Sequence, residues 1–124
     1  MKQTESPAAE GWSVGLRVWV ERNGKALLGP GRLELLEGID RWRSISAAAR
    51  ELGMSYRRAW LLVDELNRSL HEPAVATATG GAHGGGSVVT PSGLALIQCY
   101  RSIEDTAIAA AAEQIAALKR MLAP

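Results

Sequence analysis

The sequence predicts a small α+β domain in which helices predominate. Three observations support this: apolar residues recur at helical spacing along most of the chain, short stretches near residues 12–28 and 74–90 alternate as strands do, and glycine is concentrated in one loop. A length of 124 residues suits one domain with one core. A hydrophobic content of 47% with 22% charged residues is that of an ordinary globular protein.

An N-terminal β-hairpin is expected first. Residues 12–20 (WSVGLRVWV) alternate and are rich in β-branched and aromatic side chains, and residues 26–28 are apolar again. Asn23-Gly24 between them is a typical hairpin turn. The preceding residues 1–11 (MKQTESPAAEG) lack the apolar core of a signal peptide, so they are interpreted as a disordered leader.

Two helices should follow the Gly29-Pro30-Gly31 break. The first runs from about Gly31 to Arg41, and its apolar face consists of Leu33, Leu35, Leu36 and Ile39. The second is short (SAAARELG), with Ser46 as the predicted N-cap and Gly53 at its end.

A third helix is predicted after the tight turn at Met54-Ser55. Ser55 should cap it, and the helix should continue to about Leu70. Its expected core face consists of Ala59, Leu62, Val63 and Leu66. Two helices joined by a short turn that contains glycine form the helix-turn-helix pattern.

Five glycines stand among the seven residues 80–86, between expected strands at 74–79 and 87–90. A phosphate-binding P-loop is disfavoured because no Gly-Lys-Ser/Thr follows and a strand, not a helix, comes next. A dinucleotide fingerprint would need a βαβ unit, which is missing here. A strand–glycine loop–strand after a helix-turn-helix is instead typical of a wing. His83 at its tip can contact a phosphate or be merely exposed.

A long helix is expected over residues 91–122, with Thr90 as N-cap and Pro91 at the first position. Its second half carries an apolar row at alternating spacings of three and four: Ile108, Ala111, Ile115, Leu118 and Leu122. So small a domain cannot cover this row, so the row predicts a dimerisation helix. The competing interpretation is a helix that folds back as an intramolecular lid.

The formal net charge is only +1, but positive charge gathers locally. Five arginines and one glutamate between Arg41 and Trp60 give this stretch a net charge of +4. Such a basic face on a nearly neutral protein is typical of a compact DNA-binding domain, although a solvated arginine-rich surface would look the same.

The candidate DNA contacts lie at two helix N-termini. Those at the third helix would enter the major groove and are Ser55, Tyr56, Arg57 and Arg58. Ser44 and Ser46 can bind phosphates at the start of the second helix, although capping explains Ser46 equally well. Trp60, one turn into the third helix, is interpreted as a core residue.

No catalytic, cofactor or metal site is expected. His71 and His83 are not spaced with carboxylates or Cys99 as metal ligands, and no serine stands in a GxSxG motif. The single cysteine fits a reducing cytoplasm and is interpreted as a packed residue. No apolar run approaches the length of a membrane span, so no membrane association is expected.

Two stretches together resemble the DNA-binding domain of the ModE family of molybdate-responsive regulators. They are GRLELLEGIDRWRSISAAARELGMSYRRAWLLVDELN and ATATGGAHGGGSVVTPSGLALIQCY, and the resemblance covers about residues 14–112. It implies a winged helix-turn-helix over 12–90 that binds a palindromic operator in double-stranded DNA as a homodimer. It also implies that DNA is contacted by the six candidate residues at the N-termini of the second and third helices and by the wing. The wing residues are Thr79, Gly80, Gly81, His83, Gly84, Gly85 and Gly86.

The chain departs from the family pattern in two ways. His83 stands where the family tends to have lysine, and Thr77 where it has a basic residue, which implies a weaker or pH-dependent wing contact. The family's molybdate-binding domains have no counterpart here, so the resemblance implies a single-domain form with a separate molybdate-binding protein as a candidate partner.

The expected function is therefore transcriptional regulation of molybdenum-related or metal-homeostasis genes. The alternative is a protein-interaction adaptor that acts through its C-terminal helix with a separate oxyanion-binding protein or a full-length paralogue.

Overall fold

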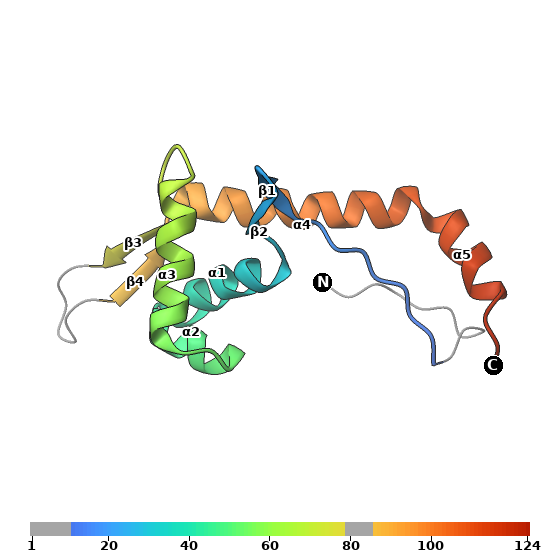
Figure 1. The fold of residues 1–124 in the computed structure, drawn as a ribbon, viewed down its shortest axis with the longest axis horizontal. Helices are drawn as coiled ribbons and strands as arrows, with labels where there is room; N and C mark the ends of the chain where they lie inside the picture. The colour runs from blue at the N-terminus through green and yellow to red at the C-terminus, as the bar shows by residue number, and fades with distance from the viewer. Residues whose placement is uncertain (1–10, 79–85) are drawn as a thin grey trace. The chain divides into compact units, whose positions relative to one another are not determined.

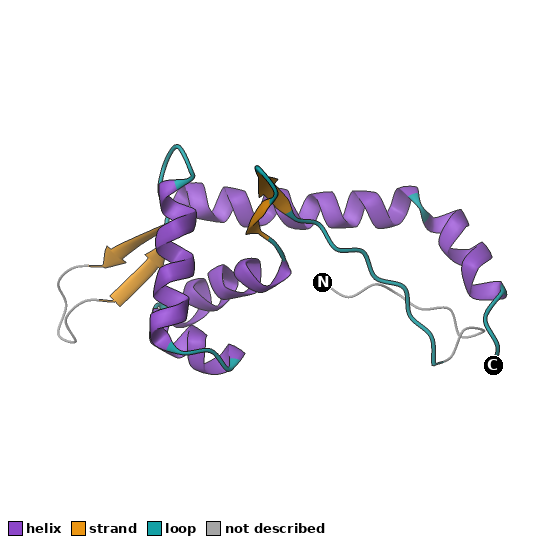
Figure 2. Ribbon diagram, viewed as in Figure 1, coloured by secondary structure: helices purple, strands orange, loops and turns teal. Residues whose placement is uncertain are grey.

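The computed structural model describes residues 11–78 and 86–124 and is an α+β structure in which helices predominate, as predicted (Figure 2). These residues belong to two compact units, one of residues 19–99 and one that joins the described residues before 19 to residues 100–124. The elements in chain order are β1 (Val20–Arg22), β2 (Lys25–Leu28), α1 (Pro30–Trp42), α2 (Ile45–Leu52), α3 (Tyr56–Arg68), β3 (Val75–Ala78), β4 (Gly86–Val89), α4 (Pro91–Ala110) and α5 (Ala112–Arg120).

The N-terminal hairpin is present but shorter than predicted. Asn23 and Gly24 both have positive φ, 53° and 79°, as the tight turn between β1 and β2 requires. The pairing extends only to Val20 opposite Leu28. The prediction of a strand over residues 12–19 was wrong. Gly29 and Pro30 turn the chain into α1 directly after Leu28, so β2 ends there and, within the described residues, offers residues 12–19 no strand to pair with.

Helices α1, α2 and α3 surround the core of the larger unit (Figure 1). The predicted apolar faces of α1 and α3 are confirmed, except that Leu62 is only half-buried. The side chains exposed by 1% or less are Leu33, Leu35, Leu36, Ile39, Ala48, Ala49, Ala59, Leu66 and Ala74. This core sets the positions of the N-termini of α2 and α3.

The helix ends near the turn follow local chemistry. Ser55 accepts a hydrogen bond from the Arg58 amide at 3.1 Å, as predicted for the N-cap of α3. The N-cap of α2 is Ser44, not Ser46: Ser44 has extended φ and ψ, and its hydroxyl accepts from the Ala47 amide at 3.0 Å. Ser46 already lies inside the helix, so its backbone cannot take the cap conformation.

Strands β3 and β4 form an antiparallel hairpin that is tied to α3 and α4. The side-chain amide of Asn67 donates to the Val75 carbonyl at 3.0 Å and accepts from the Ala74 amide at 2.8 Å. At the other side of the hairpin, Thr90 donates from its amide to the Ala74 carbonyl at 2.9 Å and caps α4 by accepting from the Gly93 amide at 3.0 Å.

The C-terminal helix is not continuous, contrary to prediction. It breaks at Ala111, whose φ of −97° and ψ of 11° depart from the helical values, and α5 takes a new direction (Figure 1). Ala111 lies within a run of four alanines, and its amide still donates to the Ala107 carbonyl at 3.1 Å, so the chain bends without losing this hydrogen bond. Within this smaller unit the indole of Trp12 donates to the Ala123 carbonyl at 2.6 Å, and the Tyr100 hydroxyl donates to the Val18 carbonyl.

Cys99 is exposed, so its interpretation as a packed residue was wrong. It lies off the face of α4 that carries the buried Gly93 and the half-buried Leu96 and Ile97. None of the helices in the described ranges combines the length and the apolar character that crossing a membrane requires.

Gly93 should be important for packing α4 against Ala74, which precedes β3, and against Val89 of β4. A Cβ at position 93 would collide with the Ala74 carbonyl oxygen and would lie 2.7 Å from Cγ1 of Val89. We expect Gly93→Ala to lower the free energy of unfolding by about 1–3 kcal/mol, the usual cost of overpacking. Urea unfolding measures this. Gly31→Ala is the matched control, because Gly31 also lies in the first turn of a helix but has open space around it. It should leave stability unchanged or raise it, and equal losses in both variants would contradict the packing role.

Glu65 of α3 joins the first hairpin to the helices. Its carboxylate lies 2.6 Å from Nζ of Lys25 and 3.1 Å from Nη2 of Arg32, and Nη1 of the same guanidinium donates to the Leu27 carbonyl. The hydrogen bond from Lys25 lowers the pKa of Glu65 below its ordinary value of 4.5; burial opposes this shift, and the charges of Lys25 and Arg32 add to it.

This network should make stability depend on acid pH. A lowered pKa means that the ionised carboxylate stabilises the fold above the unfolded-state pKa, and that this contribution disappears as pH falls through the folded-state pKa. We expect Glu65→Gln to be less stable than the unmodified protein at pH 7, and the difference in melting temperature to shrink below about pH 4.5. Glu34→Gln removes an exposed carboxylate of α1 as a control. A Glu65→Gln difference that stays constant from pH 7 to pH 3 would rule out this linkage.

Candidate nucleic-acid interface

The N-termini of α2 and α3 meet the loop-side ends of strands β3 and β4 at a surface recess of about 370 Å³. We call it the α2–α3 recess. It is lined by Ser44, Ile45, Ser46, Tyr56, Trp60, Thr77, Gly86 and Ser87. Four of the predicted DNA contacts, from three separate segments, therefore share one concave surface: Ser44, Ser46, Tyr56 and Gly86.

Hydroxyl groups give this recess its polar character. The hydroxyls of Ser44 and Ser46 lie 3.1 Å apart at the N-terminus of α2. Thr77 and Ser87 are paired across β3 and β4, so they lie side by side in the hairpin. Because none of the described residues that line the recess carries a carboxylate, an anion can approach the free amides at the start of α2 without repulsion from these residues.

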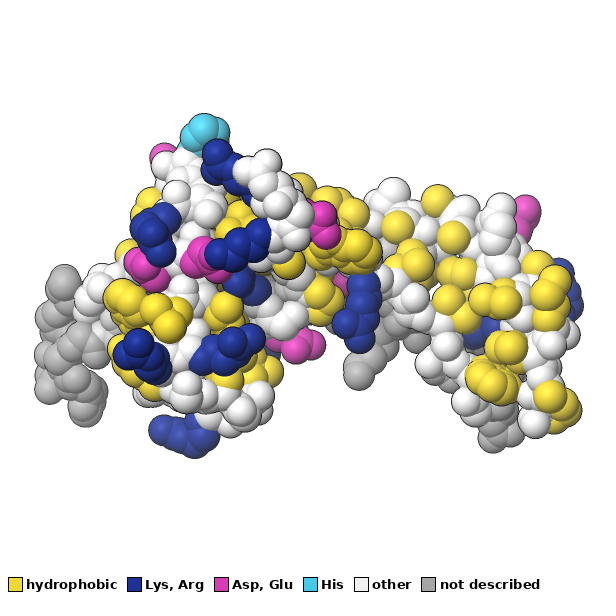
Figure 3. Space-filling model, in the orientation of Figure 1, with side chains coloured by type: hydrophobic (Ala, Val, Ile, Leu, Met, Phe, Trp, Pro, Cys, Tyr) yellow, Lys and Arg dark blue, Asp and Glu magenta, His cyan; other side chains and the backbone are white. Residues whose placement is uncertain are grey.

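The remaining predicted contacts on α3 lie beside the recess. Ser55 is used in capping, and Arg57 and Arg58 are exposed at the first turn of the helix. In the part of the chain that the structure describes, neither guanidinium group forms an ion pair with a carboxylate. The face in Figure 3 shows Lys and Arg side chains gathered over α3 and next to its N-terminal end.

Trp60 belongs to this surface, so its interpretation as a core residue was wrong. It is 46% exposed. The core face of α3 carries Ala59, Val63 and Leu66, and Trp60 is rotated by about 100° from Ala59 around the helix, which takes it off that face. Helical spacing could have predicted the exposure of Trp60. It lies four residues after Tyr56, which is also exposed, and residues four apart lie on the same side of a helix. Thr77 and Ser87 gave no comparable signal, since only the fold brings them to α2.

The glycine run is only partly described. The predicted contacts Thr79, Gly80, Gly81, His83, Gly84 and Gly85 lie outside the described residues. Gly86 lies within them, and its role is close packing: a Cβ there would lie 2.9 Å from the Arg43 carbonyl oxygen. That same oxygen accepts a hydrogen bond from the Ser87 amide at 3.2 Å, which fixes β4 against the end of α1.

The C-terminal apolar row remains accessible. Leu118 is 47% exposed, and the other members, Ile108, Ala111, Ile115 and Leu122, are half-buried. None of the five is fully covered by the described residues of its own chain.

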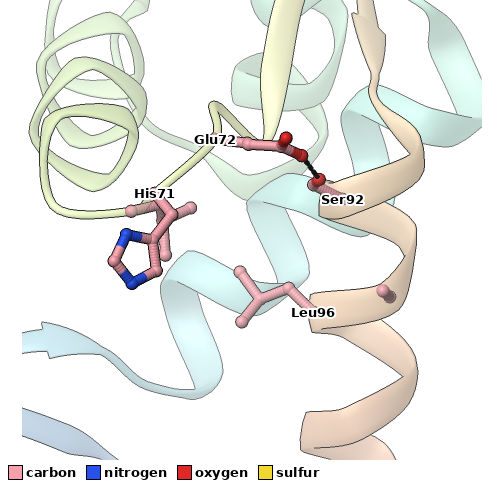
Figure 4. Close-up of a pocket in the computed structure, with 6 residues that line it drawn as sticks. His71, Glu72, Ser92 and Leu96 are labelled. Carbon is pink, nitrogen blue, oxygen red and sulfur yellow. Dashed lines mark hydrogen bonds between the residues drawn. The ribbon is translucent and has the colours of Figure 1, made fainter.

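A second recess, of about 400 Å³, lies between the end of α3 and the start of α4 (Figure 4). Its lining is mainly apolar: Leu70, Ala95 and Leu96, with His71, Glu72 and Ser92 at the polar side. Glu72 accepts a hydrogen bond from the Ser92 hydroxyl at 2.5 Å, and the His71 ring points away from this pair. The His71 ring and the Glu72 carboxylate therefore do not point toward a common site. Across the described ranges, no three His, Cys, Asp or Glu side chains are grouped as metal ligands would be.

No protein-family model matches the sequence, but curated proteins resemble it closely. The molybdenum-pterin-binding protein MopB of Rhodobacter capsulatus is 51% identical over 87 residues, which cover 70% of this chain and 32% of that protein. The molybdenum transport protein ModE of Azotobacter vinelandii is 40% identical over 73 residues, 59% of this chain and 27% of that protein. The DNA-binding transcriptional dual regulator ModE of Escherichia coli (strain K12) is 42% identical over 76 residues, 61% of this chain and 29% of that protein.

The chain thus spans about a third of the length of the curated relatives that it matches. Identities of 40–51% over more than half of this chain are high enough to indicate common ancestry. The similarity supports a relationship between this chain and the ModE family of molybdenum-related proteins.

Proposed function

We propose that this chain is a sequence-specific DNA-binding transcriptional regulator of ModE type that acts in the cytoplasm as a homodimer. One observation carries the proposal: the exposed first turn of α3, with Tyr56, Arg57 and Arg58, stands beside a hydroxyl-lined recess at the N-terminus of α2 and the loop-side ends of β3 and β4. This arrangement supports a winged helix-turn-helix.

Each part of the surface has a distinct task in this proposal. The N-terminal end of α3 enters the major groove, where an arginine can bind O6 and N7 of guanine through two parallel hydrogen bonds. The hydroxyls of Ser44 and Ser46 bind backbone phosphates and fix the register of the helix in the groove. The β3–β4 hairpin follows the adjacent backbone, with the residues of its glycine loop as further contacts.

Charge supports the same assignment. The side chains of Arg43, Arg50, Arg57 and Arg58 are exposed, and none forms an ion pair with a carboxylate among the described residues. The carboxylate of Glu51 is used locally by Arg41, at 2.7 Å, and by the Trp42 indole, at 3.2 Å. Positive potential therefore persists on a protein whose net charge is only +1, and it attracts the DNA polyanion.

We propose that this chain controls molybdenum-related or metal-homeostasis genes, because the similar proteins are named for molybdenum binding, molybdenum transport and transcriptional regulation. A separate molybdate-binding protein is a candidate partner. The alternative function, an adaptor that binds such a protein or a full-length paralogue through α5, is favoured by the exposure of Leu118 and Met121, 47% and 79%. Selection of DNA from a random library separates the two, because only the regulator enriches one sequence.

Arg57 and Arg58 should determine operator affinity. If each contacts a base, Arg57→Ala and Arg58→Ala should each weaken binding by about 1–3 kcal/mol and relax specificity at one position. Fluorescence anisotropy with a duplex from the selection measures this, at one fixed salt concentration because phosphate contacts depend on salt. Arg68→Ala, at the opposite end of α3 and paired with Asp64, is the control and should bind normally. Unchanged affinity in a folded Arg57→Ala/Arg58→Ala double variant would refute the role of α3.

The C-terminal apolar row should form the subunit interface. Ile115→Lys with Leu118→Lys places two charges in this row and should yield monomers by light scattering, because unpaired charges are costly to bury. Binding to a palindromic duplex should lose its cooperativity. Ala109→Lys with Ala116→Lys adds the same charges at exposed positions off the row and should stay dimeric. The proposal fails if the unmodified chain is monomeric at micromolar concentration.

A further inference from the structure

Trp60 differs from the other tryptophans in how its indole N–H is used. Trp12 donates to the Ala123 carbonyl at 2.6 Å, Trp19 to the Glu21 carboxylate at 2.7 Å, and Trp42 to the Glu51 carboxylate at 3.2 Å. Within the described residues, the Trp60 indole has no such partner. Neither the core nor a local hydrogen bond therefore accounts for a large aromatic side chain at this position.

The position of Trp60 is favourable for contact with a ligand. It follows Tyr56 by one helical turn, so the two rings lie on the same side of α3, and they are 46% and 56% exposed. Both rings line the α2–α3 recess. The first turn of the same helix carries Arg57 and Arg58, which pair with no carboxylate in the described part of the chain. An apolar aromatic surface therefore lies within a basic, hydroxyl-rich region.

These features indicate which chemical group of DNA Trp60 would contact. A ligand that suits this region must present an apolar group next to phosphates. In the major groove the edges of the base pairs present hydrogen-bonding groups, and the one apolar group that distinguishes them is the 5-methyl group of thymine. A tryptophan on the flank of a helix in the groove offers a flat apolar surface against which this methyl group can be buried.

We propose that Trp60, supported by Tyr56, contacts a thymine 5-methyl group in each half-site and makes the protein select thymine there. This inference rests on the proposed DNA-binding function and deepens it, because it names a specificity-determining residue and the base that it reads. The contact needs no rearrangement of the core, since Ala59, Val63 and Leu66 hold α3 from its opposite side.

Replacement of thymine by deoxyuridine tests the proposal, because it removes the methyl group and nothing else. A duplex selected by the unmodified chain from a random library is synthesised with each thymine replaced in turn. At one position in each half-site, deoxyuridine should lower the affinity about fourfold, as expected for loss of one buried methyl group. For Trp60→Ala, affinity for the thymine duplex should fall, and the thymine and deoxyuridine duplexes should bind equally.

Trp42→Ala is the matched control. Trp42 is 52% exposed but lies on α1 outside the recess, so this variant should keep the fourfold preference for thymine. Circular dichroism verifies that all variants are folded.

The inference would be overturned, while the DNA-binding function stands, if deoxyuridine substitution never affects binding by the unmodified protein or affects binding by Trp60→Ala to the same extent. Trp60→Ala that weakens every duplex equally without changing the preference for thymine would also overturn it. Failure of the unmodified chain to enrich any sequence would reject the proposed function and the inference with it.

Discussion

The side-chain amide of Asn67 is the constraint on which the arrangement of α3 and the β3–β4 hairpin depends. Its nitrogen donates to the Val75 carbonyl at 3.0 Å, and its oxygen accepts from the amides of Ala74 and Val75 at 2.8 and 3.3 Å. An amide side chain is suited to this because it offers a donor and an acceptor together, as the peptide backbone does. The end of α3 is thereby bound to the first residues of β3, and these half-buried groups are satisfied.

Hydrogen bonds of the residues next to β3 also fix the positions of β4 and α4. Ala74 is fully buried, and its carbonyl accepts from the Thr90 amide at 2.9 Å, while the Thr90 hydroxyl donates to the Pro73 carbonyl at 2.7 Å. At the other end of the hairpin, the Ser87 amide donates to the Arg43 carbonyl at 3.2 Å. The hairpin is therefore attached at both ends of its paired strands, and the α2–α3 recess lies beside the attachment at the loop end.

The distribution of ion pairs explains how a nearly neutral chain keeps a basic surface. Glu65 pairs with Lys25 and Arg32, and Glu51 pairs with Arg41, so these carboxylates are engaged away from the first turn of α3. The arginines at the start of α3 have no such carboxylate partner among the described residues. Their charge is available to a polyanion, and beside them α2 adds the partial positive charge of a helix N-terminus.

The sequence by itself determined the elements whose causes are local. The spacing of Leu33, Leu36 and Ile39, the hairpin turn at Asn23-Gly24 and the Ser55 cap each depend on residues within one or two turns of each other, so periodicity and capping rules predict them.

Only the tertiary structure decided the features that depend on distant partners. Residues 12–19 alternate like a strand but find no partner strand, and the exposure of Trp60 depends on which side of α3 the core occupies. Thr77 and Ser87 reach the α2–α3 recess only because Asn67 and the Arg43 carbonyl hold the hairpin there. Such contacts join residues far apart in the chain, and no local pattern encodes them.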